Sequence, residues 1–374
     1  MKTEILKIQD RQNGIEAIKR AAECVNSGGL VVFPTETVYG IACKVEQKSL
    51  ARLDEVKKRD TDKRYTLHIA DKDKLSDFVP SLTLPEKKLV KNAWPGPLTI
   101  VFQVDKKDID LLKKKLGPET VELLYADNTI GIRCPENNIA RELLKLCNFP
   151  VVAPSANAAG KEPATNAKQA AEQLDGLVDM VLDAGPCKYK KSSTVVKVSA
   201  AGFSILREGV YSEKQIRKML TVNIIFVCTG NTCRSPMAEG FAKKALAQKL
   251  GCSNIDQLEQ MGYKIASCGV MAMNGIGASA ESIKFCASKG VDIAGHRSQR
   301  LDAELLREAD YIFTMSADHK NDIMSISPEA GEKCMLLEGR SNINDPIGAG
   351  YEVYKACGVT IEKAVNKRIS ELLK

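Results

Sequence analysis

Short apolar segments alternate with amphipathic segments along the whole chain, and this alternation restricts the possible folds more than any other feature. The apolar segments have the length and the β-branched content of buried strands: 29–33, 98–102, 150–153, 194–198, 223–227 and 311–314. The segments between and after them have the spacing of amphipathic helices: 14–27, 48–58, 137–147, 166–176, 212–220, 236–250 and 359–373. Alternation of this kind predicts an α/β architecture in both halves.

The length of 374 residues corresponds to two or three domains of roughly 100–200 residues each. The best position for a boundary lies close to residue 221. The segment 212–220 has the pattern of a short closing helix, and a new strand begins at Asn223 without a low-complexity linker before it. We therefore predict two domains, 1–220 and 221–374.

The distribution of apolar residues argues against a membrane or secreted protein. The longest apolar runs are far shorter than the roughly 18 residues of a membrane span, and the charged segment 1–10 lacks the apolar core of a secretory signal. Because no export signal is seen, we expect a cytoplasmic protein whose 12 cysteines stay reduced. The cysteines are scattered, with no Cys-x-x-Cys pair and no zinc-like spacing. Three histidines are too few for a His-rich site, and we expect no metal bound by protein side chains.

The net charge of +7 results from 54 Lys and Arg residues against 47 Asp and Glu residues. Such a mild positive excess fits nucleotide or phosphoprotein substrates as well as it fits RNA. Charge alone therefore leaves these partners open.

One loop in the second half combines a cysteine, an arginine and the start of a helix. It runs from Cys228 to Pro236 with the sequence Cys-Thr-Gly-Asn-Thr-Cys-Arg-Ser-Pro, between a strand and a helix. Backbone N–H groups at a helix N-terminus bind anions, and they lower the pKa of a nearby thiol. We expect Arg234 to bind two phosphate oxygens and Ser235 to hydrogen-bond the thiolate. The loop therefore predicts a thiol nucleophile in a phosphate site.

Other residues complete this prediction. Gly230 and Asn231 are residue types that tolerate a positive φ in a tight loop. Pro236 suits the first position of the helix, where its missing N–H costs nothing. The reaction also needs an acid that protonates the leaving group. Asp345, in an Asn-Asp-Pro sequence near the C-terminus, is the candidate.

Residues 223–374 resemble the low-molecular-weight protein tyrosine phosphatase family, which has this Cys-x5-Arg-Ser loop and a C-terminal Asp-Pro loop. The resemblance implies a four-stranded parallel sheet in a three-layer domain that needs no cofactor. It implies that Cys228 forms a phosphocysteine, that Arg234 stabilises the transition state, and that Asp345 acts as acid and then as base. Cys233 would form a reversible protective disulfide with Cys228. The phosphate loop would consist of Thr229, Gly230, Asn231, Thr232, Cys233 and Ser235.

The substrate of the phosphatase has two candidates. Thr232 stands where tyrosine-specific relatives carry Ile, and the segment 225–239 resembles the bacterial protein-arginine phosphatase branch, in which this Thr is associated with phosphoarginine. We favour phosphoarginine over phosphotyrosine. Ile347 replaces the aromatic residue that often follows Asp-Pro, and Tyr351 or Tyr354 would be its substitute.

A thioredoxin-coupled arsenate reductase is a further alternative, because it uses a thiol in the same loop. Such an enzyme needs a closely spaced pair of resolving cysteines. The further cysteines considered for this relay lie far apart in the sequence: Cys268, Cys286, Cys334 and Cys357. We therefore rank this alternative last.

Polar and basic residues follow the apolar strands of the first half. Thr35 and Thr37 come after the strand 29–33, and further candidates follow later strands. Open α/β sheets bind ligands at such strand ends. The basic residues expected to form an anion pocket there are Lys57, Arg59, Arg133 and Arg207. The half contains neither a Walker loop nor a Gly-x-Gly-x-x-Gly sequence.

Ordered motifs over about residues 10–210 resemble the YrdC-type threonylcarbamoyl-AMP synthase family. They are Pro-Thr-Glu-Thr-Val-Tyr-Gly, Lys-x-Arg, Trp-Pro-Gly-Pro-Leu-Thr, Gly-Ile-Arg-x-Pro, Ala-Pro-Ser-Ala-Asn, Ser-Thr-Val-Val and Leu-Arg-x-Gly. The resemblance implies a twisted open mixed sheet. It also implies that L-threonine, bicarbonate and ATP, the last with Mg²⁺, give threonylcarbamoyl-AMP and pyrophosphate. The product would serve the transferase machinery that makes N6-threonylcarbamoyladenosine in tRNA.

The same resemblance assigns site residues. The threonine-binding residues would be Thr35, Thr37, His68, Arg133, Ala153 and Ser193. The nucleotide-binding residues would be Lys57, Arg59, Lys63, Thr129, Ser155, Asn157, Pro163 and Arg207. Arginine suits carboxylate and phosphate because its guanidinium group binds two oxygens at once.

The first domain also departs from its family. Asp60 replaces the Pro that usually follows Lys-x-Arg, the sequence Lys-Arg-Tyr at 63–65 replaces Asn-Pro-Leu, and Ala159 replaces the Ser of a Ser-Gly pair. The alternative is a non-catalytic regulatory module that binds RNA, double-stranded RNA included. The chain retains the basic and hydroxyl residues of the family's site, and this retention favours an active synthase over the regulatory module: Lys57, Arg59, Ser155, Ser193 and Arg207.

Overall fold

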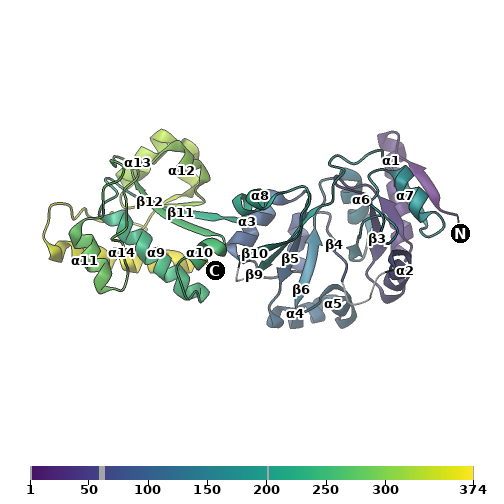
Figure 1. Ribbon diagram of the computed structural model, residues 1–374, viewed down its shortest axis with the longest axis horizontal. Coiled ribbons are helices and arrows are strands. Elements are labelled where there is room, and N and C mark those ends of the chain that lie inside the picture. Colours follow the sequence, from purple (N-terminus) through teal and green to yellow (C-terminus); the bar gives the residue numbers. More distant parts are fainter. Residues whose placement is uncertain (1, 59–63, 200–201, 374) are drawn as a thin grey trace. The chain divides into compact units, whose positions relative to one another are not determined.

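The computed structural model describes residues 2–58, 64–199 and 202–373 (Figure 1). The chain divides into two compact units, one of residues 1–82 and 86–219, the other of residues 220–374 and 83–85. Among the helices of the described residues, none combines the length and the apolar character needed to cross a membrane.

The first unit contains a mixed sheet of ten strands in the described part of the chain, in the order β1-β8-β2-β3-β7-β4-β6-β5-β9-β10. β1 pairs with β8 in parallel, whereas β2 and β3 are antiparallel. The strands are β1 (Glu4–Lys7), β2 (Val31–Phe33), β3 (Gly40–Lys44), β4 (Leu67–His68), β5 (Leu98–Gln103), β6 (Thr129–Arg133), β7 (Val151–Val152), β8 (Met180–Asp183), β9 (Thr194–Ser199) and β10 (Gly202–Arg207). The predicted mixed sheet is confirmed.

Capped helices lie between these strands. The side chain of Asp10 accepts a hydrogen bond from Asn13 N and starts α1, because it satisfies an N–H that has no partner inside the helix. Ile18 of α1 and Phe33 of β2 belong to the same buried apolar cluster. The helices are α1 (Arg11–Asn26), α2 (Gln47–Lys57), α3 (Leu84–Ala93), α4 (Lys106–Leu116), α5 (Pro118–Leu124), α6 (Asn138–Leu146), α7 (Ala167–Leu174) and α8 (Glu213–Leu220), with a 3₁₀ helix η1 (Lys72–Asp77).

The second unit contains a four-stranded parallel sheet in the order β12-β11-β13-β14. Its strands are β11 (Val222–Cys228), β12 (Tyr263–Gly269), β13 (Tyr311–Thr314) and β14 (Cys334–Leu336). Its helices are α9 (Arg234–Leu250), α10 (Gln257–Gln260), α11 (Ala280–Ser288), α12 (Ala303–Glu308), α13 (Ala317–Ile326) and α14 (Tyr351–Leu372), with a 3₁₀ helix η2 (Pro328–Lys333).

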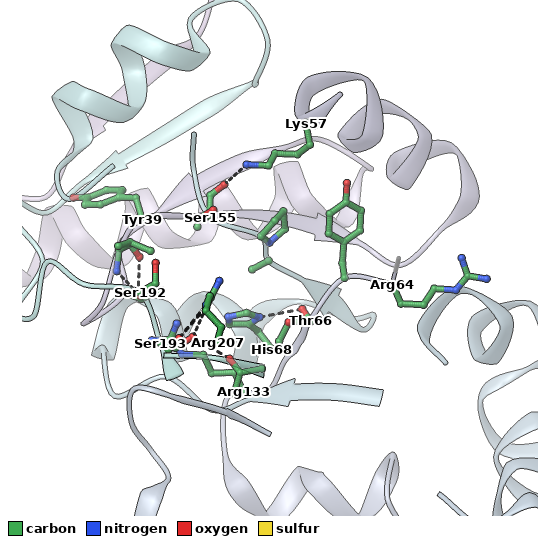
Figure 2. Close-up of a pocket in the computed structure, with 17 residues that line it drawn as sticks. Tyr39, Lys57, Arg64, Thr66, His68, Arg133, Ser155, Ser192, Ser193 and Arg207 are labelled. Atoms are coloured by element: carbon green, nitrogen blue, oxygen red, sulfur yellow. Dashed lines mark hydrogen bonds between the residues drawn. The ribbon is translucent and has the colours of Figure 1, made fainter. Parts of the chain in front are cut away.

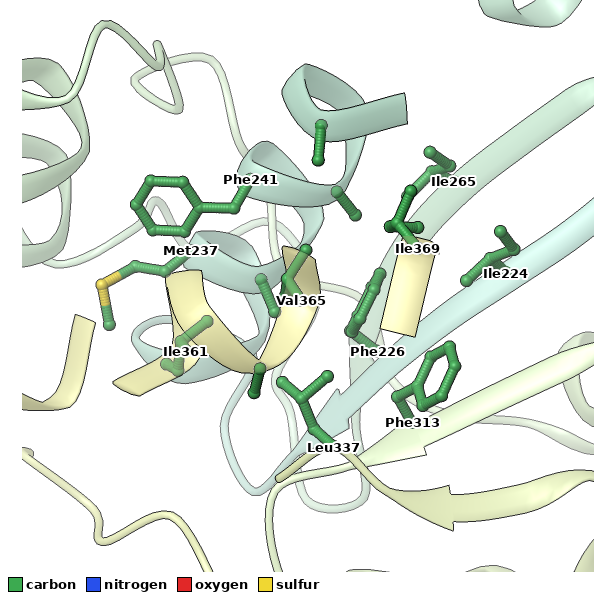
Figure 3. Close-up of a cluster of buried hydrophobic side chains, with 14 of the residues drawn as sticks. Ile224, Phe226, Met237, Phe241, Ile265, Phe313, Leu337, Ile361, Val365 and Ile369 are labelled. Atoms are coloured by element: carbon green, nitrogen blue, oxygen red, sulfur yellow. The ribbon is translucent and has the colours of Figure 1, made fainter. Parts of the chain in front are cut away.

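The residues of β11 alternate between two apolar cores, as the period of two of a strand requires. Ile224 and Phe226 belong to a core with α9, α11 and α14, part of which is drawn in Figure 3. Ile225 and Val227 belong to a second core with α12 and α13. Helices therefore cover both faces of the sheet, and the predicted three-layer arrangement is confirmed.

Three local predictions differ from the structure. The segment 150–153 forms only the two-residue strand β7. α9 begins at Arg234, so Pro236 is its third residue; the proline still fits, because N–H groups of the first turn have no partner within the helix. α14 begins at Tyr351 rather than at residue 359, since Tyr354 and Cys357 are buried on the side of the helix that faces the core.

Candidate active sites

In the second unit, the loop from Thr229 to Cys233 bends around the thiol of Cys228. Asn231 N lies 3.2 Å from the Cys228 sulfur and donates to it, and Ser235 Oγ lies 3.0 Å from the same sulfur. At the end of β12, a Cβ on Gly269 would lie 2.5 Å from Thr229 O and 2.9 Å from Asn231 N. Glycine at 269 therefore allows the loop to pack directly on β12.

Asn231 holds this loop together. Its φ is +57°, whereas Gly230 does not adopt a positive φ, so the expectation of a left-handed residue is met at Asn231 only. The side-chain amide of Asn231 donates to Ser235 Oγ and to Ser267 Oγ, at 2.9 Å each, and Gln299 N donates to Asn231 Oδ1 at 2.8 Å. His296 Nε2 contacts Asn231 O at 2.8 Å.

The pKa of the Cys228 thiol differs from the sequence-based expectation. Burial is the largest influence and raises the pKa, while the hydrogen bonds of Ser235, the charge of Arg234 and the N–H of Asn231 lower it. The net direction is upward, because burial outweighs the lowering that the loop groups produce. The loop groups supply the stabilisation that the thiolate needs to exist at all in a buried position.

Asp345, which lies 111 residues after Arg234, reaches the same site. Arg234 Nη2 forms an ion pair with the Asp345 carboxylate, and it donates to Thr229 Oγ1 at 3.3 Å; Nη1 donates to Ile343 O at 3.0 Å. Arg234 Nε is buried and has no hydrogen-bond partner among the described residues. The structure thus brings the predicted nucleophile, cation and acid together.

The residues expected around the substrate occupy different environments. Thr232 is half-buried, and its Oγ1 lies 3.6 Å from the Cys233 sulfur. Ile347, after the Asp-Pro pair, is 68% exposed. Tyr354 is buried with its hydroxyl 3.3 Å from the Cys233 sulfur, so it does not replace the missing aromatic residue on the surface. The ring of Tyr351 lies under the Lys284 ammonium, 4.3 Å from the ring centre.

The remaining cysteines of this unit do not form a second thiol site. Cys268, Cys286, Cys334 and Cys357 are buried free thiols, and burial raises the pKa of each. Burial of this kind favours the inert thiol over the reactive thiolate. These properties do not suit a thiol relay.

In the first unit, strand ends surround a cavity of about 280 Å³ (Figure 2). The predicted threonine-binding residues that line it are Thr35, His68, Arg133, Ala153 and Ser193. The predicted nucleotide-binding residues that line it are Lys57, Ser155 and Arg207. The cavity therefore collects residues from segments that are more than a hundred positions apart.

Arg133 is fixed by a carboxylate that the sequence did not single out. Its Nη2 lies 2.7 Å from Glu36 Oε1 and 2.8 Å from Thr37 Oγ1, and both charged side chains are buried, with 6% and 3% of their surfaces exposed. Arg133 Nε is buried without a hydrogen-bond partner among the described residues. Glu36 stands inside the Pro-Thr-Glu-Thr motif, but no local pattern connects it to an arginine 97 residues later.

His68 is a neutral side chain in this cavity. Its Nδ1 contacts Thr66 O at 3.2 Å, which places the proton on Nδ1 and leaves Nε2 as an acceptor. Burial and the charge of Arg133 lower its pKa to about 3. Arg207 Nη2 donates to Ser193 O at 2.9 Å and to Ser193 Oγ at 3.1 Å, as Figure 2 shows.

Lys57 connects α2 to the segment that follows β7. Its ammonium group donates to Ser155 O at 2.9 Å and to Asn157 O at 2.7 Å, and it lies 3.0 Å from Asn157 Oδ1. Ser155 Oγ donates to Asn157 Oδ1 at 2.6 Å. Asn157 thus lies behind the cavity wall and supports two of its residues.

Not every predicted residue lies at the cavity. Thr129 is at the opposite end of β6 from Arg133 and donates to Ala126 O in a turn. Pro163 is half-buried and is not part of the lining. Arg59 and Lys63 lie outside the described residues. Arg64, from the segment that departs from its family, does line the cavity.

The donor set of the cavity suits an anion rather than a metal ion. Its described lining contains four cationic side chains and no carboxylate: Lys57, Arg64, Arg133 and Arg207. Over residues 2–58, 64–199 and 202–373, no group of three or more Asp, Glu, His or Cys side chains is arranged for metal binding.

Comparison with known proteins assigns both units. The Sua5–yciO–yrdC family model, described as "Telomere recombination", matches residues 23–209, and the model "Low molecular weight phosphotyrosine protein phosphatase" matches residues 223–374. The chain is 33% identical over 216 residues to a putative threonylcarbamoyl-AMP synthase of Methanocaldococcus jannaschii, covering 56% of this chain and 95% of the relative. It is 32% identical over 154 residues to a protein-arginine-phosphatase of Geobacillus stearothermophilus, covering 40% of this chain and 95% of the relative.

Other relatives are longer than the matching region. The chain is 32% identical over 204 residues to the threonylcarbamoyl-AMP synthase of Pyrococcus abyssi, covering 54% of this chain but only 57% of the relative. A solved structure of a variant of Sua5 from P. abyssi has a TM-score of 0.51 at 20% identity, covering 89% of this chain and 98% of that one, which supports the fold. The chain therefore belongs to the Sua5–yciO–yrdC family in its first unit and to the low-molecular-weight phosphotyrosine protein phosphatase family in its second.

Proposed function

We propose that this chain is a bifunctional cytoplasmic enzyme with domains at 1–220 and 221–374. The first domain makes threonylcarbamoyl-AMP and pyrophosphate from L-threonine, bicarbonate and ATP, for transfer to tRNA by a separate transferase. The second domain hydrolyses phosphorylated proteins through a phosphocysteine, with phosphoarginine as the preferred substrate.

The observation that carries the first activity is the cavity lined by cationic and hydroxyl groups. Threonine would contact Thr35, His68, Arg133, Ala153 and Ser193, with Thr37 holding Arg133. The nucleotide would contact Lys57, Ser155 and Arg207, with Asn157 behind them. Arg59 and Lys63, which lie outside the described residues, would be further members by the family resemblance. Guanidinium groups would stabilise the charge on the α-phosphate and on the departing pyrophosphate.

His68 fits the threonine side because it is neutral. A neutral imidazole with a free Nε2 can accept a hydrogen bond from the substrate hydroxyl, whereas an imidazolium would add to the positive charge of Arg133. Arg133 Nε is a buried donor without a partner among the described residues, and a substrate carboxylate would give it one.

Pyrophosphate release tests this activity. The purified chain with ATP and Mg²⁺ is expected to release pyrophosphate only when both threonine and bicarbonate are present, since the carbamate of threonine is the group that attacks the α-phosphorus. A coupled phosphate assay in bicarbonate-depleted buffer provides the control. Absence of release under full conditions, with RNA bound instead, would establish the regulatory alternative and remove the synthase.

The observation that carries the second activity is the convergence of Cys228, Arg234 and Asp345. The thiolate would attack phosphorus while the bond from phosphorus to the leaving nitrogen breaks, and Asp345 would protonate that nitrogen. Water would then attack the phosphocysteine and give its proton to Asp345, which releases phosphate and restores the thiolate. The loop N–H groups and Arg234 would stabilise the charge on the transferring group.

Substitution of Thr232 tests which class of phosphorylated side chain is the preferred substrate. We expect Thr232→Ile to lower the ratio of phosphoarginine to phosphotyrosine turnover by about tenfold or more, because isoleucine removes a hydroxyl that a substrate guanidinium N–H can contact. The measurement compares kcat/KM for a phosphoarginine peptide and a phosphotyrosine peptide.

Thr360→Ile provides the matched control, since Thr360 is an exposed residue of α14 whose hydroxyl donates to Ala356 O. The ratio should not change in this variant. An unchanged ratio in Thr232→Ile as well would show that Thr232 does not select the substrate.

A further inference from the structure

His319, which the sequence analysis did not single out, lies on α13, on the face of the sheet opposite α9, and contacts the phosphate loop. It lies in the first turn of α13 and is 5% exposed. Its Nε2 is 2.9 Å from the hydroxyl of Thr229, the residue directly after Cys228, and its Nδ1 is 2.9 Å from Ser316 Oγ. A buried imidazole with both nitrogens in contact has a defined orientation.

Only one hydrogen bond in this chain of contacts has a direction that its partner fixes. Arg234 Nη2 can only donate, so Thr229 Oγ1 accepts from it at 3.3 Å. The hydroxyl oxygen of Thr229 can accept a second hydrogen bond as well as donate one, so two arrangements fit its contact with His319: in the first, Nε2 accepts the Thr229 proton, and in the second, Nε2–H donates to Thr229 Oγ1. In the first arrangement the imidazole proton lies on Nδ1 and is donated to Ser316 Oγ, which also accepts from His319 N at 3.4 Å. Only the first arrangement makes Thr229 Oγ1 a donor to His319 while it accepts from Arg234, and that arrangement requires a neutral imidazole.

The surroundings keep His319 neutral. Burial is the largest influence and lowers its pKa, and the charge of Arg234 lowers it further. Three carboxylates oppose this effect: Asp322 and Asp318 on α13, and Asp345 on the loop after β14. The net direction is downward, which agrees with the hydrogen-bond pattern.

Arg234 Nη2 donates to two partners, Asp345 and Thr229, and Thr229 is held in place by more contacts than Asp345. Asp345 lies on an exposed loop and has 37% of its side chain exposed. Thr229 is held through its backbone, since Met271 N donates to Thr229 O at 3.0 Å, and through its hydroxyl by His319. If Asp345 is the acid of the reaction, it must leave Arg234 to reach the leaving group, and Thr229 then remains as the partner that orients the guanidinium.

We propose that His319 is a positioning residue of the phosphatase: its neutral imidazole fixes the Thr229 hydroxyl, which holds Arg234 while Asp345 moves to the leaving group. This inference rests on the proposed phosphatase activity of the second domain. It predicts a loss of activity when His319 is protonated, because a protonated Nε2 no longer accepts from Thr229 and its charge repels Arg234.

Three variants test this role with para-nitrophenyl phosphate and a phosphoarginine peptide as probes. His319→Leu and Thr229→Val are each expected to lower kcat about tenfold with less than about a threefold change in KM, and the double variant is expected to lose no more than either alone. His319→Gln keeps an acceptor near the Nε2 position and is expected to retain most of kcat at pH 7. Since glutamine does not titrate, the acid limb of its kcat profile should shift to lower pH than that of the unmodified chain.

A second readout does not depend on turnover. Nitrogen chemical shifts of the His319 ring should report the Nδ1–H tautomer at pH 7. An unmodified chain that hydrolyses neither probe would overturn the proposed phosphatase and leave the tautomer measurable. A fully active His319→Leu variant, additive losses in the double variant, or an Nε2–H tautomer would each overturn the positioning role.

Discussion

Cys228→Ser is expected to reduce phosphatase turnover by more than about a thousandfold, equivalent to about 4 kcal/mol of transition-state stabilisation. A serine hydroxyl is far less acidic than a thiol, and the Asn231 N–H and Ser235 hydroxyl that contact the sulfur cannot generate an alkoxide at neutral pH. The loop itself should keep its shape, because Asn231 is fixed by Ser235, Ser267 and Gln299. Inorganic phosphate, measured by titration calorimetry, should therefore still bind.

The control for this prediction is Cys252→Ser. Cys252 is half-buried and its sulfur contacts Met261 rather than the phosphate loop. This variant should retain turnover, which shows that the loss is specific to position 228. Full activity of Cys228→Ser, or equal losses in both variants, would refute the assignment of the nucleophile.

Arg133→Lys is expected to lower the kcat/KM of pyrophosphate release by about a hundredfold or more. Lysine keeps the positive charge beside Glu36, so the carboxylate is not left buried without a partner, a situation that costs about 3–5 kcal/mol. The ammonium group cannot contact Glu36, Thr37 and a substrate carboxylate with the geometry of the guanidinium. The loss should therefore concern binding and orientation of threonine more than stability.

Thermal unfolding of the same variant separates these effects, and Arg52→Lys is its control. Arg52 also pairs with a carboxylate, that of Asp179, with Nη1 to Oδ2 at 2.6 Å and Nη2 to Oδ1 at 3.1 Å, and it does not line the cavity. Both variants should lose a similar, small amount of stability, whereas only Arg133→Lys should lose activity. Equal activity in the two variants would remove Arg133 from the threonine site.

Site residues that lie together in a contiguous motif could be predicted from the sequence alone. The Cys228 loop is a contiguous motif between a strand and a helix, so its position at the end of β11 follows from the order of elements. The mixed and parallel sheets agree with the family resemblances. The start of α14 could not be placed, because burial of Tyr354 and Cys357 against the core, rather than local periodicity, extends the helix.

Residues that contact the sites from segments remote in the sequence could not be predicted. Ser267, His296 and Gln299 hold Asn231 from β12 and from the segment before α12, and none of them belongs to a motif. Glu36 lies within a motif, yet it pairs with Arg133 only because the fold brings the ends of two strands close together. The direction of the Cys228 pKa also depends on burial, which a motif does not report.

The sequence by itself predicted the α/β class, the two families and the candidates for the nucleophile, the cations and the acid, because these predictions depend on hydrophobic periodicity and on contiguous motifs. Tertiary structure alone decided which side chains fix those groups: Glu36 for Arg133, Asn231 with its partners for Cys228, and Thr229 with His319 for Arg234. The physical reason is that a hydrogen bond in a buried site depends on distance and desolvation, and both are set by packing between segments that are remote in the chain.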